Sequence, residues 1–290
     1  MHPIATTNTH PTKASKNSLG DEPLRPSREV NGVVATNESE KQHNPTGIMQ
    51  HDSFMHLSPT IVAIDGPAAS GKSTVGFQLA ALSGFLYFDT GVMYRAITWG
   101  VLNAVIDPNE LAKVGAFAEK CAIDILPPQP DENDGRPNTI MVDNHDVTWQ
   151  IRTPEVDRNV SVIAANGAVR EALTGQQRRI AHRYGTGGAE KPGVVMIGRD
   201  IGTVVVPEAP LKIYLDATPE VRARRRCEEQ LDRGKVADYE QILADIYRRD
   251  QLDSERALAP LRPANDAIIL DTSVLDIDEV VGRILILGMQ

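Results

Sequence analysis

The sequence predicts an α/β fold in which a parallel β-sheet carries helices on both faces. Short apolar, β-branched runs recur along the chain, helix-like stretches lie between them, and a glycine-rich turn follows the first run. Strands buried on both faces have this continuous apolar character, and the connections between parallel strands place helices against the sheet. These observations put the first strand just before the turn and the first helix just after it.

The individual elements follow from the same patterns. The first helix is expected at residues 72–83, where Val75, Leu79 and Leu82 share one side and Gly84 is suited to end the helix. Another helix, at residues 277–287, closes the fold. The expected strands are residues 60–65, 85–88, 194–197, 211–215 and 267–270.

One segment departs from the alternation of strands and helices. Between residues 122 and 147 the sequence turns to short strand-like pieces, 123–126 and 139–142, around the turn-rich stretch PPQPDENDG. Such a change predicts a small antiparallel insert in the parallel fold. Residues 1–58 are rich in Asn, Ser, Thr and Pro without helical or strand periodicity, which predicts a disordered extension before a domain at residues 59–290.

Composition excludes several classes of function. The net charge of −9 over 290 residues argues against broad nucleic-acid binding, which needs a basic face. The only cysteines, Cys121 and Cys227, lie far apart, which favours a reducing compartment. No apolar run approaches the roughly 18–20 residues of a membrane helix, and the start of the chain has no signal-peptide pattern. We therefore expect a cytoplasmic protein that binds neither nucleic acid nor membrane.

The glycine-rich turn matches the phosphate-binding pattern G-x-x-x-x-G-K-[ST]. Its glycines permit backbone angles that direct successive N–H groups onto phosphates, and the following helix presents its positive end. Lys72 supplies a charge to the β- and γ-phosphates, and the Ser73 hydroxyl is the expected Mg²⁺ ligand. No N-K-x-D guanine signature occurs, which argues against a GTPase. The expected ATP-binding residues are Gly66, Pro67, Ala68, Ala69, Ser70, Gly71, Lys72, Ser73 and Thr74.

Two further motifs follow expected strands and indicate a phosphorylated acceptor. Residues 89–95 (DTGVMYR) follow the second strand and place Arg95 after a turn. Residues 198–203 (GRDIGT) follow the third strand, at the carboxyl edge where ligands of open α/β sheets bind. Arg199 can hold a phosphate there, and Asp200 can accept a hydrogen bond. Glycines on both sides allow close approach of a ligand, which favours this interpretation over a surface ion pair.

Taken together, these segments resemble the bacterial-type cytidylate kinases of the nucleoside-monophosphate (NMP) kinase family. Adenylate and shikimate kinases share the phosphate loop but not the whole set. The resemblance implies a P-loop NTPase core with a five-stranded parallel sheet flanked by helices, a strand-rich NMP-binding insert at about residues 104–165, and a helical lid at about residues 219–245. It covers the chain from about residue 60 to its end through IVAIDGPAASGKST, FDTGVMYR, GRDIGTVV, LKIYLDAT and RALAPLRPA.

The resemblance also implies a reaction, the ATP-dependent phosphorylation of CMP and dCMP to CDP and dCDP in pyrimidine nucleotide metabolism. Mg²⁺ would accompany ATP, the co-substrate, and the protein would be a monomer. Two alternatives stay open: another small-molecule P-loop kinase, such as a UMP-preferring one, and a catalytically inactive nucleotide-binding regulatory module. The second alternative draws on Ile197, which stands where the family commonly has an acidic residue.

Site residues carried over from the resemblance fall into three groups. Arg95 and Arg199 would hold the CMP phosphate, while Asp200, with Ser161 and Arg170, would read the cytosine edge. A carboxylate suits this task because cytosine presents an amine donor where uracil presents an acceptor. The ribose would be bound by Arg249, Asp253 and Arg256, whose spacing predicts that they share one helical face. The whole acceptor set is Thr90, Arg95, Ser161, Arg170, Arg199, Asp200, Arg249, Asp253 and Arg256.

Arginines of the expected lid complete the catalytic set. Arg222, Arg225 and Arg226 cluster on a helix that begins near Pro219. Arginine in the lid of this fold can neutralise charge on the migrating phosphoryl group. The predicted catalytic residues are Lys72, Arg199, Arg222 and Arg226. Because of Ile197, any carboxylate that helps Ser73 with Mg²⁺ would be Asp65 or Asp89.

Overall fold

The computed structural model describes residues 57–232, 234–256 and 258–289. All but the last two positions of the expected N-terminal extension lie outside these residues, so its disorder stays a prediction. Among the described helices, none is long and apolar enough to cross a bilayer.

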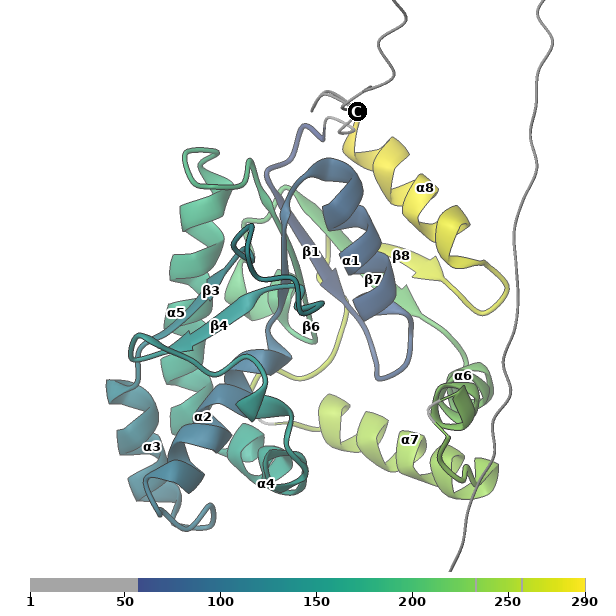
Figure 1. Cartoon of the computed structure of the whole chain (residues 1–290). Helices are drawn as coiled ribbons and strands as arrows, with labels where there is room; N and C mark the ends of the chain where they lie inside the picture. The colour runs from purple at the N-terminus through teal and green to yellow at the C-terminus, as the bar shows by residue number, and fades with distance from the viewer. Residues whose placement is uncertain (1–56, 233, 257, 290) are drawn as a thin grey trace, which may run out of the picture. The chain divides into compact units, whose positions relative to one another are not determined.

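A five-stranded parallel sheet forms the centre of the fold, in the order β2-β6-β1-β7-β8 (Figure 1). Every residue of the central strand β1 is buried, as expected for a strand covered on both faces. The predicted strands are confirmed, with ends that differ by one residue at most. They are β1 (Ile61–Asp65), β2 (Leu86–Asp89), β6 (Val194–Gly198), β7 (Leu211–Asp216) and β8 (Ile268–Asp271).

Helices cover both faces of this sheet. On one face, α1 (Lys72–Ser83) and α8 (Ile277–Gly288) pack on an apolar cluster that includes Ile64 and Ile197. On the other, α2 (Gly91–Asn103) and α5 (Gly167–Gly185) enclose a larger cluster around Phe88. The two cores hold the carboxyl ends of the strands in a fixed arrangement.

Helix α1 ends as predicted but buries a different stripe. Gly84 takes the left-handed φ of 71° that closes the helix. Val75 and Leu79 are buried, whereas Leu82 is 39% exposed. The stripe that faces the sheet is centred near Gly76, which lies against Ile197, and this centre leaves Leu82 at the border of the contact.

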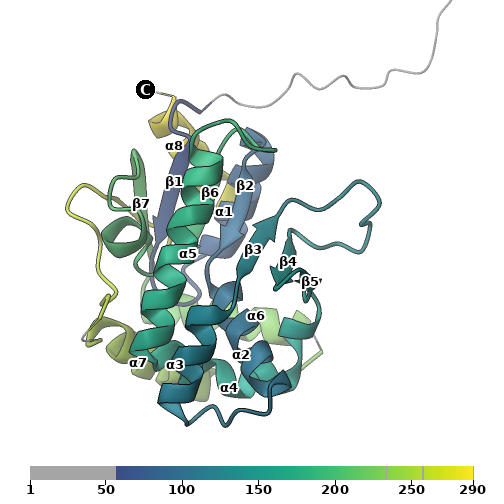
Figure 2. The same cartoon turned by 90° about the vertical axis from the view of Figure 1, so that its left-hand side faces the viewer.

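The antiparallel insert is confirmed between α2 and α5. Strands β3 (Ile123–Leu126), β4 (Thr139–Val142) and β5 (His145–Asp146) pair in sequence order (Figure 2). Helix α3 (Leu111–Lys120) precedes them, and a 3₁₀ turn (Gln150–Arg152) and α4 (Pro154–Ala165) follow.

A pair of helices extends from the carboxyl end of β7. Helix α6 (Pro219–Asp232) packs on α7 (Tyr239–Ser254) through a small apolar cluster of Ala223, Ile242 and Ile246. The cluster is separate from both main cores. The pair therefore forms a small unit with its own packing, at the place where the resemblance predicts a lid.

Candidate active site

The phosphate loop connects β1 to α1 and depends on its glycines. Gly66 has a φ of 149°, and a Cβ there would come within 2.1 Å of the Leu215 carbonyl oxygen. Gly71 has a φ of 91° directly before the first helical residue. Both positions exclude larger residues, so the loop conformation requires the spacing seen in the sequence.

Lys72 is buried inside this loop and faces neutral acceptors. Its Nζ donates to the Pro67 carbonyl at 2.5 Å and lies 3.3 Å from Ser70 Oγ. Burial, together with the positive charge of Arg199, lowers the pKa of Lys72 to about 7. Asp65 and Asp89 act on it electrostatically in the opposite sense.

Two carboxylates lie at the carboxyl edge near Lys72. Asp65 accepts hydrogen bonds of 2.8 Å from the amides of Ile201 and Gly202, and burial raises its pKa to about 6. Asp89 accepts a bond of 2.9 Å from the Gly91 amide, and burial raises its pKa as well. Asp65 therefore supports the GRDIGT turn, while Asp89 binds the first residue of α2.

Ile197, which stands where the resemblance predicts an acidic residue, packs in the apolar core. It is buried in register between Ile64 of β1 and Asp89 of β2, and its Cγ2 would lie 2.6 Å from a Cβ on Gly76. The side chain thus fills the space under α1. Asp89 keeps a carboxylate on the same face of the sheet.

The oxygen donors near the loop fit a magnesium ion. Ser73 is exposed at the start of α1, and the hydroxyl of Tyr87 lies within hydrogen-bonding reach of it. Hydroxyl and carboxylate oxygens are donors that Mg²⁺ accepts alongside water and phosphates. Within the described residues, no group of three or more His, Cys, Asp or Glu side chains forms a protein-only metal site. This donor set suits an ion that arrives with a triphosphate.

Thr90 and Arg95 follow β2 as expected. Thr90 Oγ1 donates to the Ile197 carbonyl at 3.0 Å, which ties the start of α2 to β6. Arg95 Nη1 donates to the Ile151 carbonyl at 3.0 Å, and its Nη2 lies 2.7 Å from Asp157 Oδ1. Arg95 is therefore held between α2 and the end of the insert.

Arg170 and Asp200 form a buried pair across the site. The Nη2–Oδ2 distance is 2.8 Å, and the guanidinium lies 5.6 Å from the centroid of the Tyr94 ring. Burial raises the pKa of Asp200, although the charge of Arg170 opposes this effect. The Arg170 Nε atom is buried without a hydrogen-bond partner in the protein. An unpartnered buried donor of this kind is suited to a ligand.

Asp253 joins two of the predicted acceptor arginines. It pairs with Arg199 Nε through one oxygen and with Arg256 Nη2 through the other, and it is 1% exposed. Arg249 lies nearby, and burial together with the charge of Arg199 lowers its pKa. Asp253 thus contacts the GRDIGT turn through Arg199. Arg256 lies just beyond the end of α7, so the three residues do not share one helical face as their spacing predicted.

The lid arginines have different surroundings. Arg222 is buried and pairs with Asp250, whereas Arg226 is half exposed and pairs with Glu229 at 2.6 Å. Arg225 donates to the Thr272 hydroxyl at 3.1 Å. Thr272 Oγ1 lies 3.3 Å from the Ser70 carbonyl, so this arginine is linked to the back of the phosphate loop.

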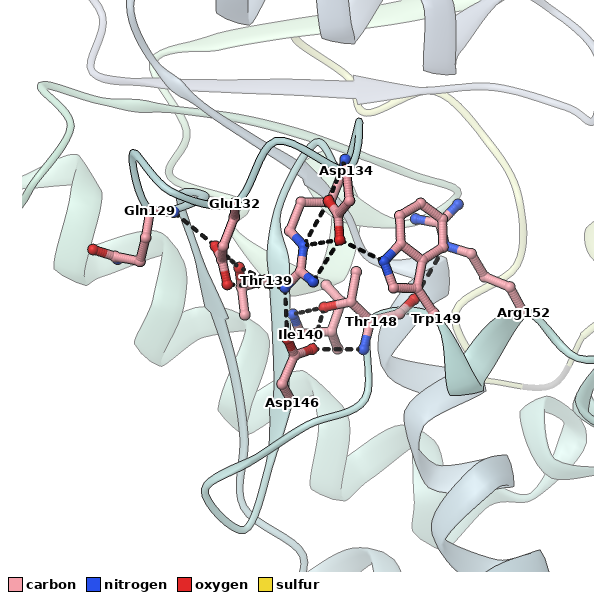
Figure 3. A network of polar contacts seen from close by, with 10 residues as sticks. Gln129, Glu132, Asp134, Thr139, Ile140, Asp146, Thr148, Trp149 and Arg152 are labelled. Carbon is pink, nitrogen blue, oxygen red and sulfur yellow. Dashed lines mark hydrogen bonds and ion pairs between the residues drawn. The ribbon is translucent and has the colours of Figure 1, made fainter.

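The insert contains a network of polar contacts that includes Glu132, Asp134 and Asp146 (Figure 3). These three carboxylates surround Arg136. Its guanidinium binds three carboxylates, with Asp134 receiving the bond from Nη2 at 2.7 Å. Asp134 also accepts from Trp149 Nε1 at 2.7 Å, and the Arg152 guanidinium lies 5.2 Å from the centroid of the Trp149 ring. The network fixes the loop before β4 against the end of the insert.

The structure brings most of the predicted residues together. The segments that carry Lys72, Arg95 and Arg199 follow the neighbouring strands β1, β2 and β6, so the phosphate loop and the two arginine motifs share the carboxyl edge of the sheet. Ser161 lies on the exposed side of α4. Sequence reasoning missed residues that hold the predicted ones, among them Tyr94, Asp157, Asp250 and Thr272.

Comparison with known proteins gives a consistent result. The family model described as Cytidylate kinase matches residues 62–289. A cytidylate kinase of Roseiflexus castenholzii is 46% identical over 228 residues, which is 79% of this chain and 93% of that protein. A cytidylate kinase of Bacillus pumilus is 45% identical, covering 77% of this chain and 93% of its own. A cytidylate kinase of Herpetosiphon aurantiacus is 44% identical, covering 82% of this chain and 98% of that protein.

Proposed function

Because the chain belongs to the cytidylate kinase family, we propose that it transfers the γ-phosphate of ATP to CMP and dCMP. The observation that carries the proposal is the position of Lys72, Arg95 and Arg199, which follow the neighbouring strands β1, β2 and β6 at one edge of the sheet. A lysine in a phosphate loop and arginines across the cleft are the parts that a transfer between two phosphorylated nucleotides needs.

The phosphate loop would bind the triphosphate of ATP. Amides of residues 66–73 would surround the β-phosphate, and Lys72 would place its charge on the β- and γ-phosphates. Magnesium, bound at Ser73 with Asp89 nearby, would neutralise charge on the phosphates. Tyr87 would orient the Ser73 hydroxyl.

Arginines of the acceptor side would orient the monophosphate for in-line attack. Arg95 and Arg199 would hold the phosphate of CMP, and Arg249 and Arg256 would meet the ribose with Asp253. The attacking oxygen already carries charge, so no general base is required, and catalysis depends on positioning and charge neutralisation. No covalent intermediate with the protein forms.

Asp200 and Arg170 would select the base, together with Thr90 and Ser161. The Asp200 carboxylate accepts from the exocyclic amine of cytosine, and uracil offers an acceptor at the same place. A uracil there would set an acceptor against the buried Asp200 carboxylate where cytosine sets a donor, which disfavours UMP. Arg226, the more exposed lid arginine, would reach the transferred phosphoryl group as the lid closes, with Arg222 behind it. We further propose that the protein works as a monomer in the cytoplasm.

An acceptor screen tests the proposed function. The full chain is assayed with ATP, Mg²⁺ and CMP, dCMP, UMP, AMP or shikimate, with ADP release coupled to a spectroscopic signal. We expect turnover with CMP and dCMP and far weaker turnover with the others. Preference for UMP, AMP or shikimate would refute the acceptor assignment, and CMP binding without turnover would favour an inactive regulatory module.

A further inference from the structure

Asp250 on α7 holds Arg222 on α6 through two parallel hydrogen bonds. The Nη1–Oδ1 distance is 3.0 Å and the Nη2–Oδ2 distance is 2.5 Å. Arg222 is only 3% exposed, and its Nε donates to the Ala217 carbonyl at 2.8 Å. A bidentate pair of this kind is both strong and geometrically specific. Asp250 has no part in the ATP and acceptor sites described above.

The same guanidinium touches the phosphate loop. Arg222 Nη1 lies 3.3 Å from the carbonyl oxygen of Ala68, within the loop. Arg222 thus makes a polar connection from α7 to the loop through Asp250. The other lid connection, from Arg225 through Thr272 to Ser70, runs from α6 and does not involve α7.

One turn further along α7, Asp253 holds the acceptor side. It pairs with Arg199, which follows β6, and with Arg256 just beyond α7. A spacing of three residues makes Asp250 and Asp253 neighbours on one helix. One rigid element therefore contacts the arginine behind the phosphate loop and the arginine expected to bind the acceptor phosphate.

We propose that Asp250 is a positioning residue that makes nucleotide binding at the phosphate loop depend on occupancy of the acceptor site. This inference rests on the proposed function for the places of the two ligands. A phosphate monoester at Arg199 competes with Asp253 for the guanidinium, and the ribose engages Arg249 and Asp253. Helix α7 thus exchanges its contact with Arg199 for contacts with the ligand and moves with α6. Asp250 passes this movement to Arg222 and to the Ala68 carbonyl. The two nucleotides consequently bind with positive cooperativity.

Calorimetry on the full chain measures this coupling. CMP is titrated without and with a saturating non-hydrolysable ATP analogue, and the ratio of the two Kd values is the coupling factor. For the wild type we expect a factor of at least about fivefold, at the low end of typical allosteric couplings. Asp250→Asn keeps the size of the side chain but removes its charge. It should bring the factor close to one and leave the Kd for CMP alone within about twofold.

A matched control separates this effect from a general loosening of the lid. Tyr247 Oη donates to Glu220 Oε1 at 2.8 Å, so it also joins α6 to α7, but both side chains are exposed and this bond includes no group of the phosphate loop. Tyr247→Phe should retain the wild-type coupling factor. An unchanged factor in Asp250→Asn, an equal loss in Tyr247→Phe, or a wild-type factor of one overturns the proposal.

A second measurement needs no variant. In hydrogen exchange on the wild type, CMP alone should change the protection of amides at residues 217–224 and in the loop at residues 66–73. A change confined to α2, α5 and α7 would contradict the proposal. Failure of CMP to bind would instead count against the proposed function, and the same coupling ratio would then be measured with the acceptor that the screen identifies.

Discussion

The two sides of the candidate active site hold their positive charges in different ways. On the donor side, the Lys72 ammonium group meets a carbonyl at 2.5 Å and a hydroxyl at 3.3 Å, both of them neutral. On the expected acceptor side, four of the five predicted arginines pair with a carboxylate; the pairs are Arg95–Asp157, Arg170–Asp200, Arg199–Asp253 and Arg256–Asp253.

Because of this difference, the two sides of the site would bind anions in different ways. A buried cation without a directly paired anion is poorly solvated, which explains why the pKa of Lys72 falls to about 7. A triphosphate supplies the missing charge. Arg95 and Arg199, which are proposed to bind the monophosphate, already have anionic partners, so the phosphate would compete with a carboxylate for each guanidinium. Donor binding should therefore depend on the charge state of Lys72, and acceptor binding on the strength of the existing pairs.

The largest expected effect comes from removing the Lys72 ammonium group, which has no directly paired anion. Lys72→Met keeps the apolar stem and deletes the charge, so kcat/KM with CMP should fall by about 10³-fold or more, as for other groups that stabilise transition-state charge. Thermal unfolding should shift little, because a desolvated amine is replaced by an apolar group. Lys113→Met, at an exposed pair with Glu110, is the control. A loss smaller than about tenfold would mean that Lys72 does not serve the transferred phosphate.

Base selection by the acceptor pairs should show the next largest effect. In Asp200→Asn the side chain can donate as well as accept, so the penalty against uracil is relieved. We expect the ratio of kcat/KM for CMP over UMP to fall about 10–100-fold. Asp124→Asn, which disturbs an ion pair in the insert, should leave the ratio unchanged. An equal fall for both substrates would show that Asp200 supports the fold of the site and does not read the base.

The two sides of the site also differ in how much of their structure could be predicted from the sequence. The sheet was predictable because its strands are apolar throughout, and the phosphate loop because its chemistry lies within eight consecutive residues. The carboxylates that pair with the arginines could not be predicted from the sequence. Arg199 meets Asp253 from 54 residues away, and only the fold brings them together.

A second example is the turn after Asp200. Residues Ile201–Val205 form a π-helix, a rare conformation that no local pattern indicated. Its first amides bond to Asp65, which lies 136 residues earlier than Ile201 in the chain. Contacts at such separations impose a backbone shape that local propensity does not encode.

Protonation of Lys72 should make binding of the ATP analogue depend on pH, and this effect should be of intermediate size. Its pKa is about 7 without a ligand and rises when a triphosphate binds, because negative charge favours the ammonium form. Between the two pKa values, binding takes up a proton, so uptake should be near zero at pH 6 and approach one proton per site above about pH 8. Affinity for the ATP analogue should weaken over the same range, by at most about tenfold per pH unit.

Calorimetry in buffers of different ionisation enthalpy measures this uptake directly. Lys72→Arg keeps a permanent charge at the same place and should abolish the uptake attributable to residue 72 while retaining nucleotide binding. Uptake that persists in this variant would assign the proton to another group. Asp65, whose pKa is raised to about 6, is the nearest candidate, and it would act at lower pH.

The smallest expected effect tests whether a carboxylate competes with the CMP phosphate for the Arg95 guanidinium. Asp157 on α4 is about half exposed and pairs with Arg95 at 2.7 Å, so its removal costs little stability. If the carboxylate and the CMP phosphate compete for the same guanidinium, Asp157→Asn should tighten CMP binding, by up to about fivefold since such pairs contribute at most about 1 kcal/mol.

The sign of this change distinguishes competition from support. A carboxylate that merely orients Arg95 for the ligand would give weaker CMP binding in Asp157→Asn, whereas a competitor gives tighter binding. Arg95 also donates to the Ile151 carbonyl at 3.0 Å, a contact that keeps the side chain in place when its charged partner is lost. Titration of CMP at low and high salt sharpens the comparison, because the gain should shrink as added ions screen the exposed pair. A gain that is independent of salt would mean that the carboxylate acts through the fold and not through its charge.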